Sequence, residues 1–289
     1  IMHGNNIGEI FHDFKRLSMA RHTSNVHRRI LPGDRDRYPA ETMESLGRML
    51  GDTGIRLDPD RLRLLWRYHE LIRLHNDNND LTRLRNFRDF VVKHYIDCLI
   101  VPSLVTLPSP LLDIGTGAGF PGIPLKIGVP GLHVILSEGR SKRVEFLQLA
   151  VRELALEGIE IFGRGILPGR LGRKVGGVIT RALESASDTL GRISDILDPG
   201  GLVILMKGPK GTEEVNEAIE RHGDDFFLKT KISYTLADTS HLRTLLVFEK
   251  KAPPIDKPLK EKSAFMRDTQ ITSPDNPSYK TWKSLLSGR

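Results

Sequence analysis

The stretch Asp113-Ile-Gly-Thr-Gly-Ala-Gly-Phe-Pro-Gly-Ile-Pro124 decides the fold. A short apolar strand is expected to end at Asp113, and Pro121 and Pro124 suit the first turn of a following helix. The glycines between them let backbone amides approach a ligand closely. A strand, a glycine turn and a helix in this order predict a cofactor cradle. The residues of this cradle expected to contact the cofactor are Asp113, Gly115 and Gly117.

An acidic residue follows the next expected strand. Glu138 stands 19 residues after Gly119, the separation at which a carboxylate binds both hydroxyls of a ribose. The segment 117–122 also fits the dinucleotide pattern G-x-G-x-x-G, so the pattern alone leaves a nicotinamide oxidoreductase and a methyltransferase open. In the dinucleotide fold, however, the first glycine directly follows the strand, whereas here that junction comes two residues earlier, at Gly115.

Outward from the glycine turn, short apolar runs alternate with amphipathic stretches. Strands are expected at 111–114, 133–136, 178–180 and 202–206, and helices at 123–128, 141–157 and 184–197. This alternation predicts a doubly wound α/β sheet. Two further runs, 226–234 and 242–248, predict an antiparallel hairpin at the edge of the sheet, and helical spacing before the sheet predicts helices near 41–50, 58–76 and 88–101.

Composition bounds the class of protein. Apolar residues make up 39% and the 27 glycines bring the chain to the level of ordinary globular proteins, which argues against coiled coil or general disorder. No apolar run approaches the roughly 18 residues of a membrane span, so no membrane partner is expected. Cys98 is the only cysteine and is expected to be a structural thiol, which favours the reducing cytoplasm. We expect a monomer.

The distribution of charge predicts three regions. The net charge of +7 divides into +3 for residues 1–40, −1 for residues 41–249 and +5 for residues 250–289. We therefore expect a loosely ordered appendage over 1–40, one folded domain with its own N-terminal helices over 41–249, and a basic tail over 250–289. Because the excess lies in the two ends, we expect their removal to weaken RNA affinity but to preserve cofactor binding.

Further strings accompany the glycine turn. They are Asn79-Asp-Leu-Thr-Arg83, His94-Tyr-Ile-Asp97, Glu138-x-x-x-Lys142-Arg143-x-x-Phe146-Leu147, Thr180-Arg-Ala182, Met206-Lys-Gly208 and Arg243-x-Leu-Leu-Val247. With the glycine turn, they resemble the bacterial small-subunit ribosomal RNA methyltransferase G family, also called the glucose-inhibited division protein B family. The resemblance covers residues 41 to 250, and the glycine string with its two prolines is specific to that family.

This resemblance implies a class I S-adenosylmethionine-dependent methyltransferase that modifies N7 of a guanine in the 530 loop of 16S rRNA. It implies that Gly115 and Phe120 line the cofactor site, that Gly165 and Ile166 face the adenine, and that Arg181 closes the site. The family usually has Arg-Ala/Val-Glu where this chain has Arg164-Gly-Ile166, so the acidic contact is missing here. Backbone amides can still make a contact at that place.

Methyl transfer to guanine N7 requires no general base, because N7 carries a lone pair and no proton. The enzyme needs mainly to hold donor and acceptor in line. Arg181, at the end of a strand, is the candidate catalytic residue, since a guanidinium can contact RNA phosphate, guanine O6 or the cofactor carboxylate. The spacing of His94 and Asp97 predicts a packing or capping role against the sheet, or a contact with RNA or the active site, and no third ligand for a metal is evident. Asn79–Arg83 predicts a tight turn or a lip of the site.

Basic residues gather in the segment 161–183, which contains no acid. Together with the start of the helix after Glu138, they predict a phosphate-binding rim. The expected RNA-binding residues are Arg140, Lys142, Arg143, Arg164, Arg173 and Lys174. The expected partner is 16S rRNA or a small-subunit assembly particle. A non-catalytic RNA-binding protein with the same fold stays open as a third alternative, supported by the change at Gly165-Ile166.

Overall fold

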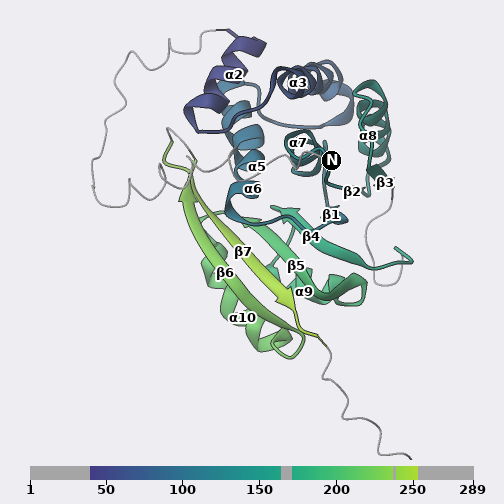
Figure 1. Ribbon diagram of the computed structural model, residues 1–289, viewed down its shortest axis with the longest axis vertical. Helices are drawn as coiled ribbons and strands as arrows, with labels where there is room; N and C mark the ends of the chain where they lie inside the picture. Colours follow the sequence, from purple (N-terminus) through teal and green to yellow (C-terminus); the bar gives the residue numbers. More distant parts are fainter. Residues whose placement is uncertain (1–39, 164–170, 237–238, 253–289) are drawn as a thin grey trace, which may run out of the picture. The chain divides into compact units, whose positions relative to one another are not determined.

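A seven-stranded sheet forms the centre of the computed structural model, which describes residues 40–163, 171–236 and 239–252 (Figure 1). The strand order is β3-β2-β1-β4-β5-β7-β6. Strands β1 to β5 are parallel to one another, and β7 pairs antiparallel with both β5 and β6. The expected doubly wound α/β sheet with N-terminal helices and an antiparallel edge hairpin is confirmed. The appendage up to residue 39 and the tail from 253 lie outside the described residues.

The elements follow one another in α/β alternation. The strands are β1 (Leu111–Ile114), β2 (Val134–Ser137), β3 (Ile159–Phe162), β4 (Val175–Arg181), β5 (Leu197–Lys207), β6 (Phe226–Thr235) and β7 (Leu242–Lys250). The α-helices are α2 (Met43–Asp52), α3 (Pro59–Asn79), α4 (Phe87–Phe90), α5 (Asp97–Leu99), α6 (Val101–Leu104), α7 (Gly122–Gly128), α8 (Ser141–Glu153), α9 (Ala186–Ile193) and α10 (Glu214–His222). A π-helix, η2 (Val91–Ile96), and two 3-10 turns, η3 (Ser194–Ile196) and η4 (Pro209–Glu213), complete them.

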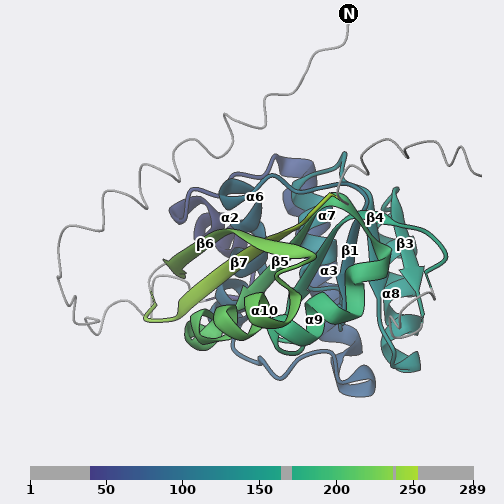
Figure 2. The same cartoon turned by 90° about the horizontal axis from the view of Figure 1, so that it is seen from below.

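Helices cover both faces of the sheet. Helices α9 and α10 pack on one face, where Leu190 and Ala218 join the apolar side of β4 and β5. Figure 2 shows these two helices on the side opposite α2, α6 and α7. On that other face, α3, α7 and α8 contribute buried side chains such as Leu65, Ile123 and Leu147 to one large cluster. The N-terminal helices are therefore part of the main core.

The strand order reverses direction between β1 and β4. From β1 the chain continues outward to β2 and β3 and then crosses back to β4, which pairs with β1 through Asp113 and Ile179. In open parallel sheets, ligands bind beyond the carboxyl ends of the strands at such a switch point. The glycine turn follows β1 and Arg181 ends β4, so both lie at this place.

The predicted helix at 88–101 has an irregular start that proves important for the site. Over Val91–Ile96 the backbone widens into a π-helix. There the Asp97 amide donates to the carbonyls of Val92 and His94 and passes over that of Lys93. The carbonyl of Lys93 is then available to a side chain from outside the helix. Short π segments in helices occur frequently at functional sites.

Three elements differ from the sequence expectation. β3 and α10 were not predicted, and α8 ends earlier than the expected 157, where Ala155 takes a positive φ of 47°. β3 is short and its residues are only half-buried, so its sequence lacks the apolar run that identifies a central strand. No helix of the described ranges has the length and apolar character needed to cross a membrane.

Candidate active site

The glycines of the turn serve different purposes. At Gly119 (φ +111°) an added Cβ would lie 2.5 Å from Ile123 Cδ1, and at Gly122 it would lie 2.3 Å from Leu136, so these two allow close packing. At Gly115 (φ +71°) the space is taken by Leu183, 2.6 Å away. At Gly117 (φ +61°) an added Cβ would meet only the Arg143 guanidinium, at 3.8 Å. Gly117 is therefore the turn glycine with room for a ligand beside its backbone.

The buried carboxylate of Asp113 holds the glycine turn in place through hydrogen bonds. Its Oδ2 accepts hydrogen bonds from Thr116 Oγ1 at 2.6 Å and from the Gly122 amide at 2.8 Å, while Oδ1 is buried without a partner. Complete burial raises the pKa of this carboxyl from 3.8 to about 6. Of the predicted cofactor residues, Asp113 thus holds the start of α7 against β1 and is itself inaccessible to solvent.

Glu138 is joined to the glycine turn. Its Oε2 accepts the Gly117 amide at 3.0 Å, and its Oε1 accepts the amides of Gly139 and Arg140 at 2.8 and 2.9 Å. An ionised carboxylate has about four acceptor positions, so Oε2 keeps room for one further donor. The predicted bidentate contact with a ribose requires Glu138 to give up one of these amides.

Arg181 is held rigidly at the end of β4. Its Nη1 donates to the Lys93 carbonyl at 2.8 Å, its Nη2 is 3.1 Å from His94 Nδ1, and Nη1 lies 3.7 Å from Asp97 Oδ2. Its Cζ lies over the Phe120 ring, 5.2 Å from the centroid. Phe120 itself is buried, so it supports Arg181 from beneath. A guanidinium has five N–H donors, and those not used here remain for a substrate.

Asp97 joins two arginines from different strands. Its Oδ1 accepts from Arg243 Nε at 3.2 Å, and its Oδ2 faces Arg181. Burial raises the pKa of Asp97, although both guanidinium groups act to lower it. Asp97 therefore ties the N-terminal helices to β4 and β7. The thiol of Cys98, next in the chain, is fully buried as expected, and burial raises its pKa.

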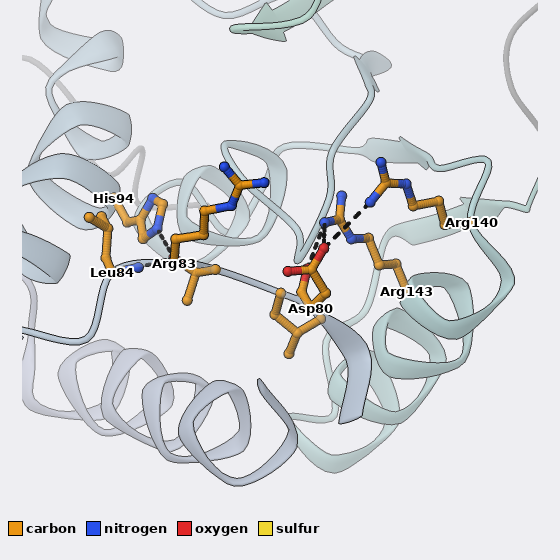
Figure 3. Close-up of a pocket in the computed structure, with 8 residues that line it drawn as sticks. Asp80, Arg83, Leu84, His94, Arg140 and Arg143 are labelled. Carbon is orange, nitrogen blue, oxygen red and sulfur yellow. Dashed lines mark hydrogen bonds and ion pairs between the residues drawn. The ribbon is translucent and has the colours of Figure 1, made fainter. Parts of the chain in front are cut away.

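A cavity of about 410 Å³ opens beside these groups (Figure 3). Its lining residues are Asp80, Leu81, Thr82, Arg83, Leu84, His94, Arg140 and Arg143. Pockets of this size suit small ligands. The predicted lip at Asn79–Arg83 thus contributes to the cavity. Among the described residues Arg83 forms no hydrogen bond or ion pair, and its side chain is exposed.

Asp80 connects the lip to α8. It takes the left-handed conformation (φ 49°) at the end of α3. Its carbonyl and its carboxylate accept from Arg143 Nη2 at 2.6 and 3.3 Å, and Arg140 lies 3.6 Å from the same carboxylate. Figure 3 shows both arginines directed at Asp80. Arg143 also approaches Glu138, at 4.0 Å.

The structure brings together only part of the predicted basic rim. Arg140, Lys142 and Arg143 lie at the start of α8, beside the glycine turn. Arg173 and Lys174 precede β4 and so lie at the opposite end of that strand from Arg181. Arg173 pairs there with Glu160, at 2.5 Å. The structure therefore separates these two residues from the rest of the expected rim by the length of β4, and their contact with RNA stays a prediction.

Three other residues expected to contact the cofactor or RNA, Arg164, Gly165 and Ile166, lie outside the described residues. Conversely, sequence reasoning assigned no individual role to Asp80, Arg83, Leu183 or Arg243. Leu183 follows Ala182, which has a positive φ of 51°, and its side chain is exposed beside Gly115. Arg243 stands in one of the family strings, which was its only signal in the sequence.

Comparison with known proteins gives the family. The family profile described as "rRNA small subunit methyltransferase G" matches residues 61–241. The protein named ribosomal RNA small subunit methyltransferase G 2 of Syntrophobacter fumaroxidans is 42% identical over 259 residues, covering 88% of this chain and 51% of the relative. This chain therefore spans about half the length of that relative.

Two further relatives have similar names. Ribosomal RNA small subunit methyltransferase G 2 of Bdellovibrio bacteriovorus is 41% identical over 183 residues, covering 63% of this chain and 71% of the relative. Ribosomal RNA small subunit methyltransferase G of Carboxydothermus hydrogenoformans is 34% identical over 208 residues, covering 68% of this chain and 86% of the relative. These matches favour a methyltransferase over the nicotinamide enzyme that the glycine pattern left open. The chain belongs to the rRNA small subunit methyltransferase G family.

Proposed function

We propose that this chain transfers the methyl group of S-adenosylmethionine to N7 of a guanine in the 530 loop of 16S rRNA. The observation that carries the proposal is the hydrogen bond from the Gly117 amide to Glu138 Oε2, 3.0 Å long. It joins the glycine turn to the acidic residue beside the switch point of the sheet. Arg181 stands at the end of the adjacent strand, β4. Family membership supports the same reaction and the same substrate. As expected from the sequence, we propose a cytoplasmic monomer.

The residues present fit the cofactor. The open side of Gly117 leaves space beside the backbone, and Glu138 Oε2 has capacity for a ribose hydroxyl. Arg143, which lines the cavity next to Gly117, offers a positive charge for the cofactor carboxylate. When bound, S-adenosylmethionine would supply an electrophilic methyl group on a sulfonium. Gly165 and Ile166 remain the proposed neighbours of the adenine.

Arg181 is the proposed catalytic residue. Its partners hold the guanidinium in one orientation before any substrate arrives, which is how positioning accelerates an in-line displacement. Its unused N–H donors can bind guanine O6 or a neighbouring phosphate. The chain needs no general base, because guanine N7 has no proton to lose. The side chain therefore contributes orientation and charge.

The proposed RNA contacts lie around the cavity. Arg140, Lys142 and Arg143 supply the positive charge on the α8 side, and Arg83 supplies it from the lip. Asp80 neutralises part of the charge of Arg140 and Arg143, so Arg83 is the least compensated cation of the cavity lining. Phosphate contacts of this kind position an RNA without reading its sequence.

The decisive experiment maps N7-methylguanine. The purified chain is incubated with S-adenosylmethionine and either 16S rRNA or small-subunit particles that lack this methyl group. Borohydride and aniline then cleave the RNA at N7-methylguanine. We expect cleavage at one guanine of the 530 loop, dependent on both chain and cofactor. Arg181→Ala is expected to lower the yield strongly while thermal unfolding shows that the fold is intact.

The other outcomes identify the alternatives. Calorimetric binding of the cofactor and of RNA without any cleavage would support a non-catalytic RNA-binding protein. Binding of NAD and not of S-adenosylmethionine would support an oxidoreductase. Full cleavage by Arg181→Ala would remove Arg181 from the proposed catalytic role. Comparison of the two RNA substrates decides between free rRNA and an assembly particle.

A further inference from the structure

A histidine between Arg181 and the lip has no role in the reaction proposed above. The His94 ring stacks on Phe120, with centroids 4.3 Å apart and planes 10° from parallel. Its Nδ1 lies 3.1 Å from Nη2 of Arg181, and its Nε2 lies 2.9 Å from Oγ1 of Thr82. His94 is thus in contact with the proposed catalytic arginine on one side and with the lip on the other.

The chemistry of the neighbours fixes where the proton of His94 resides. Arginine has only donors, so the Nη2 contact at 3.1 Å requires Nδ1 of His94 to be an unprotonated acceptor. A neutral imidazole then carries its proton on Nε2, which donates to Thr82 Oγ1. The same hydroxyl oxygen accepts the Leu84 amide at 3.1 Å. Arg181 thus donates to His94 and His94 donates to Thr82, whose hydroxyl oxygen accepts from both His94 and the Leu84 amide.

The π-helix brings a set of acceptors to Arg181. The Lys93 carbonyl and the His94 ring face the guanidinium from this segment, and the Asp97 carboxylate faces it from the residue directly after the π-helix. Lys93 and Asp97 both approach Nη1, whereas His94 is the acceptor of Nη2. Without His94, Nη2 would lose the partner that sets the rotation of the planar group.

We propose that His94 is a positioning residue that acts as a neutral acceptor, orienting Arg181 through Nδ1 and holding the lip of the cavity through Nε2. The inference rests on the proposed function, because Arg181 is the residue through which His94 acts. It assigns to His94 no contact with the methyl group or the guanine. The predicted alternatives for His94, packing or an active-site contact, are thereby combined in one role.

The surroundings of the ring favour the neutral state. The charged and titratable groups that face it are Arg181 from β4, Arg73 and His69 from α3, and Lys93 of its own segment. Burial, followed by the positive charge of Arg181, lowers the pKa of His94 well below its usual value. A protonated His94 would place a donor and a second positive charge against Arg181, and the hydrogen bond would be lost.

Three variants separate this role from simple packing. His94→Asn keeps an acceptor close to the Nδ1 position, and His94→Phe keeps the ring on Phe120 but has no acceptor. Thr82→Val leaves the Arg181 contact of His94 in place but removes the hydroxyl that accepts from His94 and from the Leu84 amide. We expect His94→Phe to lower kcat roughly 10- to 100-fold with cofactor affinity little changed, because misplaced catalytic groups cost about that much. His94→Asn is expected to recover most of kcat, and Thr82→Val to change mainly KM for RNA.

A spectroscopic measurement tests the proton assignment without any reaction. In the free 289-residue chain labelled with ¹⁵N-histidine, the His94 signals are expected to be those of a neutral ring protonated at Nε2, across pH 6 to 8. Arg181→Ala is expected to relax this preference. Thermal unfolding shows that each variant is folded.

Several results would overturn the proposal. A ring protonated at Nδ1 contradicts it, as does wild-type kcat in folded His94→Phe or an Asn variant no better than Phe. If the wild-type chain transfers no methyl group, the proposed function fails, while the ¹⁵N result still decides whether His94 is the acceptor of Arg181.

Discussion

Gly117 and Gly119 stand two residues apart and allow a matched comparison. An alanine at Gly117 (φ +61°) would be destabilised only by the left-handed backbone conformation, which costs about 1–2 kcal/mol. At Gly119 (φ +111°) the methyl group would also collide with Ile123 and the Tyr68 hydroxyl, at 2.5 and 2.8 Å. We expect Gly117→Ala to remain folded but to lose cofactor affinity roughly tenfold, and Gly119→Ala to lose considerably more stability. Urea unfolding and calorimetry measure the two effects, and equal unfolding losses would contradict the assignment.

The RNA contact of Arg83 can be tested against Arg173, which lies at the far end of β4. If Arg83 binds a phosphate, Arg83→Ala lowers RNA affinity and reduces the slope of log affinity against log salt by about 1. Arg173→Ala is expected to leave both unchanged, because Glu160 holds this arginine away from the site. Filter binding over a range of salt concentrations measures the slopes. If the two substitutions lower RNA affinity and the salt slope equally, Arg173 also binds RNA, and the continuous basic rim expected from the sequence is supported.

At the scale of elements, one carboxylate joins the N-terminal helices to two strands. Asp97 is 2% exposed and faces Arg181 of β4 and Arg243 of β7. Removing one partner of a buried ion pair costs about 3–5 kcal/mol. Asp97→Asn is therefore expected to lower the free energy of unfolding by about 3 kcal/mol or more. The control is Asp89→Asn, whose half-exposed pair with Lys93 is worth less than about 1 kcal/mol. Similar losses in urea unfolding would contradict this difference.

The elements also show what the sequence could predict. The central strands and the hairpin were predictable because long apolar runs or alternation mark them. β3 was not, since Ile159-Glu-Ile-Phe162 is short and half-buried. The π-helix could not be read from its residues, because their apolar spacing is also that of an α-helix. In the fold its Lys93 carbonyl accepts a hydrogen bond from Arg181 of β4, a contact that the local sequence does not reveal.

The site residues also divide into those whose position the sequence predicts and those whose position it does not. The positions of Gly117, Glu138 and Arg181 at one edge of the sheet were predictable, because each lies within three residues of the end of an expected strand, whereas their roles stay predictions. Arg83 and Arg243 come from segments far away in the chain, and their proximity to the site depends on how the N-terminal helices and the edge hairpin pack. Charge alone also misled, since Arg173 and Arg181 are close in sequence but lie at opposite ends of one strand.

For the molecule as a whole, Asp113 predicts a pH effect on stability. Its folded pKa of about 6 lies above the ordinary 3.8, so the folded state binds the proton more tightly and gains stability as pH falls. Relative to Asp113→Asn, the wild type is expected to gain about 2 kcal/mol between pH 7.5 and 4.5. His69 and His94, whose pKa values are lowered by burial, act in the opposite direction in both proteins and cancel in the difference.

Urea unfolding of both proteins at the two pH values gives this difference. If the difference in free energy of unfolding between the wild type and Asp113→Asn does not change with pH, Asp113 has the same pKa in the folded and unfolded states. The substitution also changes hydrogen bonding with Thr116 and Gly122, which shifts this difference in free energy by the same amount at both pH values. Only the change with pH therefore tests the prediction.

The pairing of β1 with β4 has a consequence for folding kinetics. Asp113 and Ile179 are neighbours in the sheet but far apart in the chain, so this contact carries a high loop-closure cost and forms slowly. Glu138 and Arg181 share one site only after it has formed. A ligand that needs both therefore binds the native state alone, and stabilises it in proportion to RT ln(1 + [L]/Kd). The cofactor should thus slow unfolding and leave the refolding rate unchanged.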